Sequence, residues 1–149
     1  MSRRHAGHVA RMTRDEAMHF LTEGTHTGKL ATASPSAAPH VAPIWFVLAD
    51  RDVVFMTGRD TIKGRHLRAN PRAALAVDVS EYPYHFVVVH GSVVIDEHAA
   101  DLLSWSTRIA ARYVPPGEAD EYGRRNAVPS EMLCRLRVER ITGERDLAL

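Results

Sequence analysis

The chain has little of several residue classes, and each shortage excludes a class of protein. Cys134 is the only cysteine among 149 residues, so no internal disulfide can form and we expect a reducing, cytoplasmic compartment. No apolar run approaches the roughly 20 residues that a membrane-spanning helix needs, and the basic amino-terminal stretch lacks the apolar core of a signal peptide. The formal net charge is only +1. We therefore expect neither a membrane nor a nucleic acid among its partners.

Motifs for catalysis by protein side chains are missing as well. The sequence contains no nucleophile elbow, no metal-binding helix motif, no Walker pattern and no visible pair of acid–base carboxylates. Its nine histidines are scattered, and the two on one expected strand, His85 and His90, have opposite parity and so point to opposite faces. Cys134 belongs to an alternating apolar pattern that indicates packing rather than nucleophilic attack. We predict no metal site and name no catalytic side chain.

The composition is otherwise that of a globular protein, with 45% apolar and 25% charged residues. We expect a flexible tail over residues 1–12 and one domain over residues 13–149. The domain begins with a capping box, in which Thr13 and Glu16 satisfy each other's backbone donors, and the helix that follows is expected to close at Gly24.

Short apolar runs separated by turn residues predict six strands, over residues 30–33, 41–48, 53–57, 73–79, 86–95 and 132–139. Gly91 interrupts the fifth run and indicates a bulge or bend, and the last run alternates like a half-buried edge strand. An amphipathic helix is expected over residues 97–113. The loop over 114–130 has room for one more helical turn and is expected to serve as a lid or binding loop. This pattern is typical of a small antiparallel barrel. Several of its strands are too apolar for a one-sided sheet, so we expect a homodimer.

The segment from Gly58 to Arg72 concentrates positive charge in a nearly neutral chain. It holds one anion, Asp60, and five cations: Arg59, Lys63, Arg65, Arg68 and Arg72. Thr61 is the expected N-cap of a short helix that ends at Asn70-Pro71. A helix start with free N–H groups, a hydroxyl and a lysine one turn inside is suited to an anion. The alternative is a solvated basic turn between two strands.

A second feature lies just before this segment. Pro43, Ile44, Trp45 and Phe46 form a stiff strand with wide apolar faces, and Thr57, Thr61 and Lys63 offer polar anchors at the next strand end. A flat aromatic ligand with an anionic tail would suit the pair. The alternative is that Trp45 and Phe46 simply pack in the core.

Two long stretches resemble a known family. They read G-K-L-A-T-A-S-P-S-A-A-P-H-V-A-P-I-W-F and F-M-T-G-R-D-T-I-K-G-R-H-L-R-A-N-P-R-A-A-L, and the likeness continues through F-V-V-V-H-G, A-A-R-Y and R-L-R-V-E-R-I-T-G. They are similar to the pyridoxamine-phosphate-oxidase-like split-barrel family and, more closely, to its deazaflavin branch, which uses coenzyme F420. The resemblance implies a mainly β fold, a six-stranded antiparallel split barrel with short flanking helices, and a dimer with two cofactor sites at its interface.

The resemblance also implies which residues hold the cofactor. The ring system would lie along the second strand, at Val41, Ala42, Pro43, Ile44, Trp45 and Phe46. The phosphate end would meet the exit of the third strand and the following helix, at Met56, Thr57, Thr61, Ile62, Lys63 and Arg65. Phe86 of the partner subunit would reach the ring.

Departures from the family pattern favour F420 over FMN. FMN-using oxidases of the family have an arginine directly before the lysine, where this chain has Ile62, and they carry a C-terminal tryptophan and an arginine–histidine pair that are missing here. The FMN phosphate would lose a bidentate partner, whereas Arg59, Lys63, Arg65 and Arg68 could serve the longer F420 tail as a basic channel. We therefore expect a reductase that transfers hydride between F420 and a small organic substrate. An FMN-dependent oxidase or reductase and a non-catalytic flavin or deazaflavin carrier remain alternatives.

Overall fold

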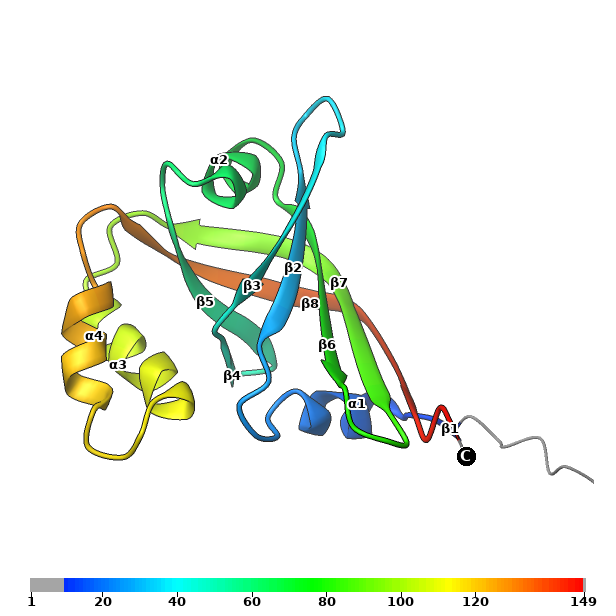
Figure 1. Cartoon of the computed structure of the whole chain (residues 1–149). Helices are drawn as coiled ribbons and strands as arrows, with labels where there is room; N and C mark the ends of the chain where they lie inside the picture. The colour runs from blue at the N-terminus through cyan, green and yellow to red at the C-terminus, as the bar shows by residue number, and fades with distance from the viewer. Residues whose placement is uncertain (1–9, 149) are drawn as a thin grey trace, which may run out of the picture.

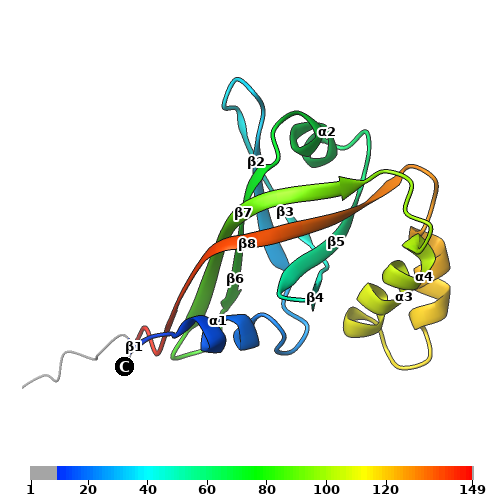
Figure 2. The same cartoon turned by 180° about the vertical axis from the view of Figure 1, so that it is seen from behind.

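The fold is an antiparallel sheet with four short helices, seen from two sides in Figures 1 and 2. The computed structural model describes residues 10–148. The strands are β1 (Ala10–Arg11), β2 (Gly28–Ala33), β3 (Pro39–Ile44), β4 (Val47–Ala49), β5 (Asp52–Gly58), β6 (Arg72–Val79), β7 (His85–Asp96) and β8 (Glu131–Arg145). The helices are α1 (Arg14–Phe20), α2 (Ile62–Ala69), α3 (Leu102–Tyr113) and α4 (Ala119–Asn126).

The sheet has eight strands and is not closed by hydrogen bonds, which corrects the expected six-stranded barrel. Its order is β3-β2-β6-β7-β8-β5-β4, with β1 paired to β8. One added strand comes from a break in the expected strand 41–48 at Phe46. The Phe46 N–H donates to Tyr113 Oη over 3.2 Å, and its carbonyl accepts from Arg112 Nη1 over 2.9 Å. Because side chains of α3 take these groups, the chain leaves β3 at one sheet edge and begins β4 at the other.

The amino-terminal end of the fold begins earlier than expected. The expected tail over residues 1–12 falls for the most part on residues 1–9, which lie outside the described residues. Ala10 and Arg11 pair with Arg145 and Glu144 of β8, and the Met12 N–H donates to the Gly143 carbonyl over 2.8 Å. The capping box is confirmed, with both Thr13–Glu16 hydrogen bonds at 3.1 Å.

Two element boundaries and the place of one strand differ from the sequence expectation. Helix α1 ends at Phe20, four residues before Gly24. Helix α3 begins only at Leu102, because Asp96 Oδ1 accepts the His98 N–H over 3.0 Å and forms a turn there. Strand β8 runs between β7 and β5 and is therefore central, whereas an edge strand was expected.

The segment 114–130 has more helix than the single turn that the sequence allowed. It contains α4, which lies beside α3 in both cartoons (Figures 1 and 2). Ser106 Oγ donates to the Gly123 carbonyl over 2.8 Å, and a Cβ on Gly123 would lie only 2.1 Å from Thr107 Oγ1. This close approach fixes α4 against α3, so the two helices form a packed hairpin beside the sheet.

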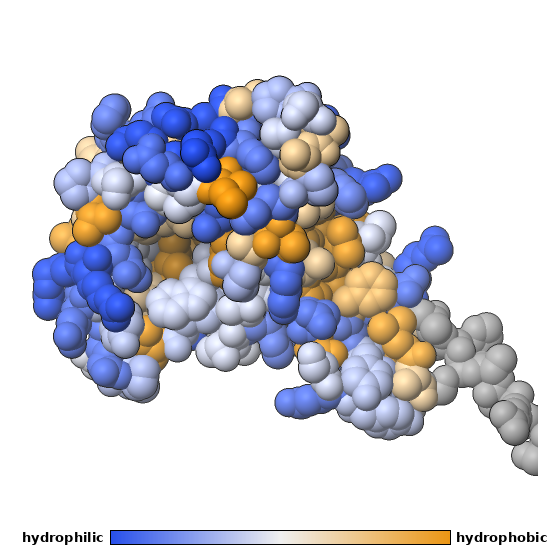
Figure 3. Space-filling view, turned by 45° about the horizontal axis from the view of Figure 1, so that its top comes forward, coloured by the Kyte–Doolittle hydropathy of each residue, from blue (hydrophilic) through white to orange (hydrophobic). Residues whose placement is uncertain are grey.

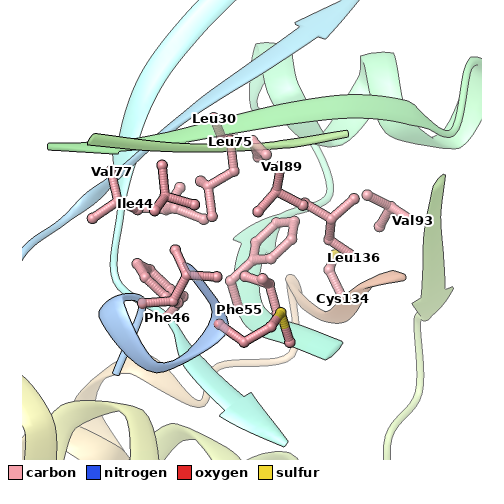
Figure 4. Packing of buried hydrophobic residues seen from close by; sticks show 14 of the residues in the cluster. Leu30, Ile44, Phe46, Phe55, Leu75, Val77, Val89, Val93, Cys134 and Leu136 are labelled. Atoms are coloured by element: carbon pink, nitrogen blue, oxygen red, sulfur yellow. The ribbon is translucent and has the colours of Figure 1, made fainter. Parts of the chain in front are cut away.

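The core lies inside the curled sheet (Figure 4). Inward residues alternate along each strand, as Leu30, Leu75, Val89 and Leu136 do on four different strands, and all four are fully buried. The expected irregularity at Gly91 is confirmed: the β7–β8 register shifts between His90 and Gly91, where a Cβ would meet the Arg137 carbonyl oxygen. Within residues 10–148 no helix has the length and apolar character required to cross a membrane.

Candidate functional site

A pocket of about 290 Å³ opens where the end of β3 meets β5, α2, the α3–α4 hairpin and the start of β8. Its lining residues are Pro43, Ile44, Trp45, Met56, Lys63, Ser106, Ile109, Asn126 and Glu131. Segments far apart in sequence therefore meet at one place, and apolar walls combine with few polar groups. That combination is typical of a small-molecule site.

Trp45 forms an aromatic wall of the pocket and is held from behind by α3. Its ring stacks on the ring of Tyr113 with centroids 5.0 Å apart and planes 8° from parallel. The Tyr113 hydroxyl lies 3.1 Å from the carbonyl oxygens of both His26 and Phe46. Burial raises the pKa of Tyr113, so the hydroxyl keeps its proton at neutral pH and remains a donor. The strand break at Phe46 thus orients the neighbouring tryptophan.

Lys63 and Glu131 are the two ionisable residues of the pocket lining. Burial raises the pKa of the half-buried Glu131 carboxyl, and the positive charge of Lys63 opposes that rise. Behind them, burial and the nearby Glu131 raise the pKa of the Cys134 thiol to about 12. Cys134 is fully buried and protonated at neutral pH, which agrees with the expected packing role.

The start of α2 is built as the sequence predicted. Thr61 is its N-cap, and its hydroxyl accepts the Gly64 N–H over 3.0 Å and donates to the Gly58 carbonyl over 2.8 Å. A Cβ at Gly64 would lie 2.1 Å from the Gly58 oxygen, so only glycine permits this approach. In the first turn, the N–H groups of Ile62 and Lys63 have no acceptor among residues 10–148. They remain available to a ligand.

The predicted site residues separate into two groups. Five of them line the pocket together: Pro43, Ile44, Trp45, Met56 and Lys63. The others do not line it: Val41, Ala42, Phe46, Thr57, Thr61, Ile62, Arg65 and Phe86. Phe46 and Thr57 are buried in the fold, whereas Val41 and Ile62 are exposed. Phe86 lies in a separate hollow with Arg11, Thr142, Gly143 and Glu144. Their roles in binding stay predictions.

The basic segment is not one channel. Arg59 Nε and Arg68 Nη1 lie 3.3 and 3.6 Å from Glu97 Oε1, so both guanidinium groups share one carboxylate. Arg68 and Glu97 line a second hollow with Leu67, Pro71, Val93 and Ile95, away from the residues that surround Lys63. Arg65 is exposed and forms no ion pair within residues 10–148. The expected set of four cations therefore reduces to Lys63 in the pocket.

Four lining residues were missed by sequence reasoning: Ser106, Ile109, Asn126 and Glu131. Ile109 was assigned to the apolar stripe of α3, and no motif marks the other three. Ser106 is committed to α4 by its hydrogen bond to Gly123. Asn126 stands at the end of α4 and reaches the pocket because α4 packs on α3, whereas Glu131 begins β8 and is placed there by its pairing with Gly58 of β5. No cluster of three or more potential metal ligands occurs in the described part of the chain.

The family follows from a comparison with family models. The model described as Pyridoxamine 5'-phosphate oxidase matches residues 14–144. The chain belongs to this family. The match includes every element from α1 to α4 and nearly all of β8, so it confirms the split-barrel resemblance. No curated protein matches the chain.

Solved structures of similar fold cover most of the chain. The conserved hypothetical protein Rv2991 from Mycobacterium tuberculosis is 22% identical, with a TM-score of 0.78, over 100% of this chain and 94% of that one. An F420 reductase is 25% identical, with a TM-score of 0.66, over 83% and 94%. A FAD-binding protein from Mesorhizobium loti is 22% identical, with a TM-score of 0.66, over 91% and 95%.

Proposed function

We propose that this protein is a cytoplasmic F420-dependent reductase that transfers hydride between the deazaflavin and a small organic substrate. The observation that carries the proposal is the pocket itself, which places the Trp45 wall beside Lys63 at the start of α2. A planar ring fits the first feature and an anionic group fits the second. The similarity to an F420 reductase supports the choice of cofactor within the family.

The residues present fit such a cofactor. Pro43, Ile44 and Trp45 offer an apolar face for the ring, while the Lys63 ammonium and the N–H groups of Ile62 and Lys63 offer donors to an anionic group. When bound, the deazaflavin supplies or accepts the hydride. The chain's own residues hold and orient the ring, and the α3–α4 hairpin excludes water from that side of the pocket. The pocket is at the small end of the usual range, so part of a large cofactor would extend beyond it.

We propose that a second copy of the chain covers this remaining part. The outward positions of β3, β2, β6 and β7 form a continuous row, because Val41 pairs with Ala31, Ala31 with Ala74, and Ala74 with His90. Val41, a large apolar side chain, is 65% exposed there. Apolar patches among hydrophilic atoms are visible on the face shown in Figure 3. A partner packed on this row would hide it and bring a second copy of Phe86 toward the ring.

Titration of the purified protein with F420 and with FMN, followed by fluorescence, tests the cofactor. We expect F420 to bind more tightly, because the FMN phosphate has no arginine at position 62. Tenfold tighter binding of FMN, about 1.4 kcal/mol, would reverse the ranking and favour the FMN-dependent alternative. The carrier alternative predicts tight F420 binding without turnover across a broad panel of electron-poor substrates.

Lys63→Ala tests where the anion binds. The change should weaken F420 binding by roughly 1.5–3 kcal/mol, the scale of a charge-assisted hydrogen bond, and this loss should shrink as salt rises. Arg68→Ala is the matched control, because it removes the same charge from the same helix on the side occupied by Glu97. Equal weakening in both variants would mean that only the general positive field matters and that the site is misplaced.

Light scattering at micromolar concentration tests assembly, and we expect twice the chain mass. Ala74→Glu puts a charge in the middle of the outer row and should give monomers that lose F420 affinity. Val94→Glu places the same charge on an exposed position outside that row and should leave the dimer intact. A monomeric parent with full cofactor affinity would contradict both the dimer and the shared site.

A further inference from the structure

The pocket contains a carboxylate that an anion-binding site would not require. Glu131 begins β8, and its register partner is Gly58, the residue whose carbonyl anchors the N-cap of α2. A methyl group on Gly58 would lie 4.0 Å from Glu131 Oε1, so the carboxyl stands beside the helix start. Lys63 lines the same pocket from the first turn of α2. One positive and one negative group therefore face the same ligand space.

The two charges are not joined in a contact ion pair. Within residues 10–148 no oxygen of Glu131 lies within 4.0 Å of Lys63 Nζ, although the positive charge of Lys63 acts on the Glu131 carboxyl. An anionic ligand bound at Lys63 would thus lie close to the Glu131 carboxylate. Because a half-buried site screens charge poorly, that repulsion opposes binding as long as Glu131 is ionised.

We propose that Glu131 determines the charge specificity of the pocket: an anionic group binds at Lys63 with Glu131 protonated, so binding takes up one proton. The proposal deepens the proposed function, because it assumes that the anionic part of the cofactor meets Lys63. A ligand without an anionic group would bind with no such requirement. In this step one proton from solvent binds to one oxygen of the Glu131 carboxylate, and no other bond forms or breaks.

The surroundings of Glu131 support this assignment. Lys63 is the charged group that faces it from α2, and Cys134 on β8 is protonated. The lining residues of α3 and α4, Ser106 and Asn126, are neutral, and Arg59 is turned to Glu97. Burial already raises the pKa of Glu131, and the positive charge of Lys63 is the one influence that lowers this pKa. An anion that neutralises Lys63 removes the effect that lowers the pKa of Glu131, so the carboxyl is protonated more readily in the complex.

The experiment compares Glu131→Gln with the parent between pH 5.5 and 8.5. The probes are F420, and sulfate, which does not titrate in this range. F420 binding is followed by fluorescence and sulfate binding by thermal shift. We expect the ratio of parent to variant dissociation constant to rise at least tenfold from pH 5.5 to 8.5. The ionisation of the ligand is common to both proteins and cancels in this ratio. Calorimetry of F420 binding in two buffers of different ionisation enthalpy should show proton uptake that the variant lacks.

Glu97→Gln is the control, because it removes the same charge from the other side of the basic segment. For this variant the ratio of parent to variant dissociation constant should stay constant with pH. A constant ratio for Glu131→Gln, or the same rise in both variants, would overturn the proposal. If the parent binds neither F420 nor FMN at any pH, the proposed function fails instead. The sulfate measurements then decide the role of Glu131 by the same criterion.

Discussion

Arg112 connects the pocket wall to the rest of the fold, and replacing it with alanine should lower the stability of the protein. Its Nη1 donates to the Phe46 carbonyl over 2.9 Å, and its Nη2 donates to the Leu21 carbonyl over 2.8 Å. Two more exposed bonds reach the carbonyls of Gly24 and Glu23 over 3.0 and 3.2 Å. The guanidinium carbon also lies 4.6 Å from the centroid of the Phe46 ring. One side chain thus joins the end of α1, the strand break at Phe46 and α3.

The expected loss of stability depends on how far each of these hydrogen bonds is buried away from water. The bonds to Phe46 and Leu21 are partly buried, and a charged donor contributes about 1.5–3 kcal/mol to each such bond. The exposed bonds add little, because water replaces them. Bonds made by one group are not additive, so we expect Arg112→Ala to lower the free energy of unfolding by about 3 kcal/mol. For a chain of this size that corresponds to a loss of about 6–12 °C in melting temperature.

Urea unfolding at fixed protein concentration, followed by tryptophan fluorescence, measures this loss. The near-ultraviolet circular dichroism of the Trp45–Tyr113 stack should weaken as well. Arg112 fixes the backbone at Phe46, and Trp45 is the residue directly before it, so the loss of this bond should loosen the tryptophan ring. Arg108→Ala is the matched control on the same helix, where the Arg108 side chain is exposed and its bond to the Leu48 carbonyl spans 3.5 Å. We expect it to cost below about 1 kcal/mol. Equal costs for the two variants would refute the assignment of Arg112 as the connecting residue.

Three further outcomes follow from the same geometry. Gly64→Ala should lower the melting temperature and weaken F420 binding together, because its Cβ would meet the Gly58 carbonyl oxygen; a variant as stable as the parent would contradict this close approach. Gly91→Ala should destabilise the protein without changing the pocket, because its Cβ would meet the Arg137 carbonyl oxygen; cofactor affinity measured at low temperature should be unchanged. Cys134 should resist a thiol reagent at pH 8 until the protein is unfolded, and stability should fall as pH rises from about 9 toward 12, because the folded thiol has the higher pKa; rapid labelling of the folded protein would oppose this.

Local signals in the sequence located the individual strands well, but they could not show what lies next to each one. The capping box, the N-cap at Thr61 and the irregularity at Gly91 each depend on a few neighbouring residues, and all three are confirmed. The break after Ile44 was not visible, because the groups that cause it belong to α3, more than sixty positions later. The apolar run 41–48 therefore looked like one strand. Contacts between distant segments also hid Asn126, which depends on the packing of α4 on α3, and Glu131, which depends on the pairing of β8 with β5.

The division of the basic segment shows why a cluster of charges in sequence need not form one surface. Residues of a helix advance by about 100° each, so Arg68 points about 140° away from Lys63 although both belong to α2. Arg68 therefore lies beside Glu97, which follows β7, whereas Lys63 shares the pocket with Glu131 at the start of β8. Because the single carboxylate of Glu97 offsets one of the two guanidinium charges at close range, the positive potential that Arg59 and Arg68 offer to a ligand is reduced. Among residues 10–148 Lys63 has no such contact partner, and its potential stays directed into the pocket, where the protonation of Glu131 can control it.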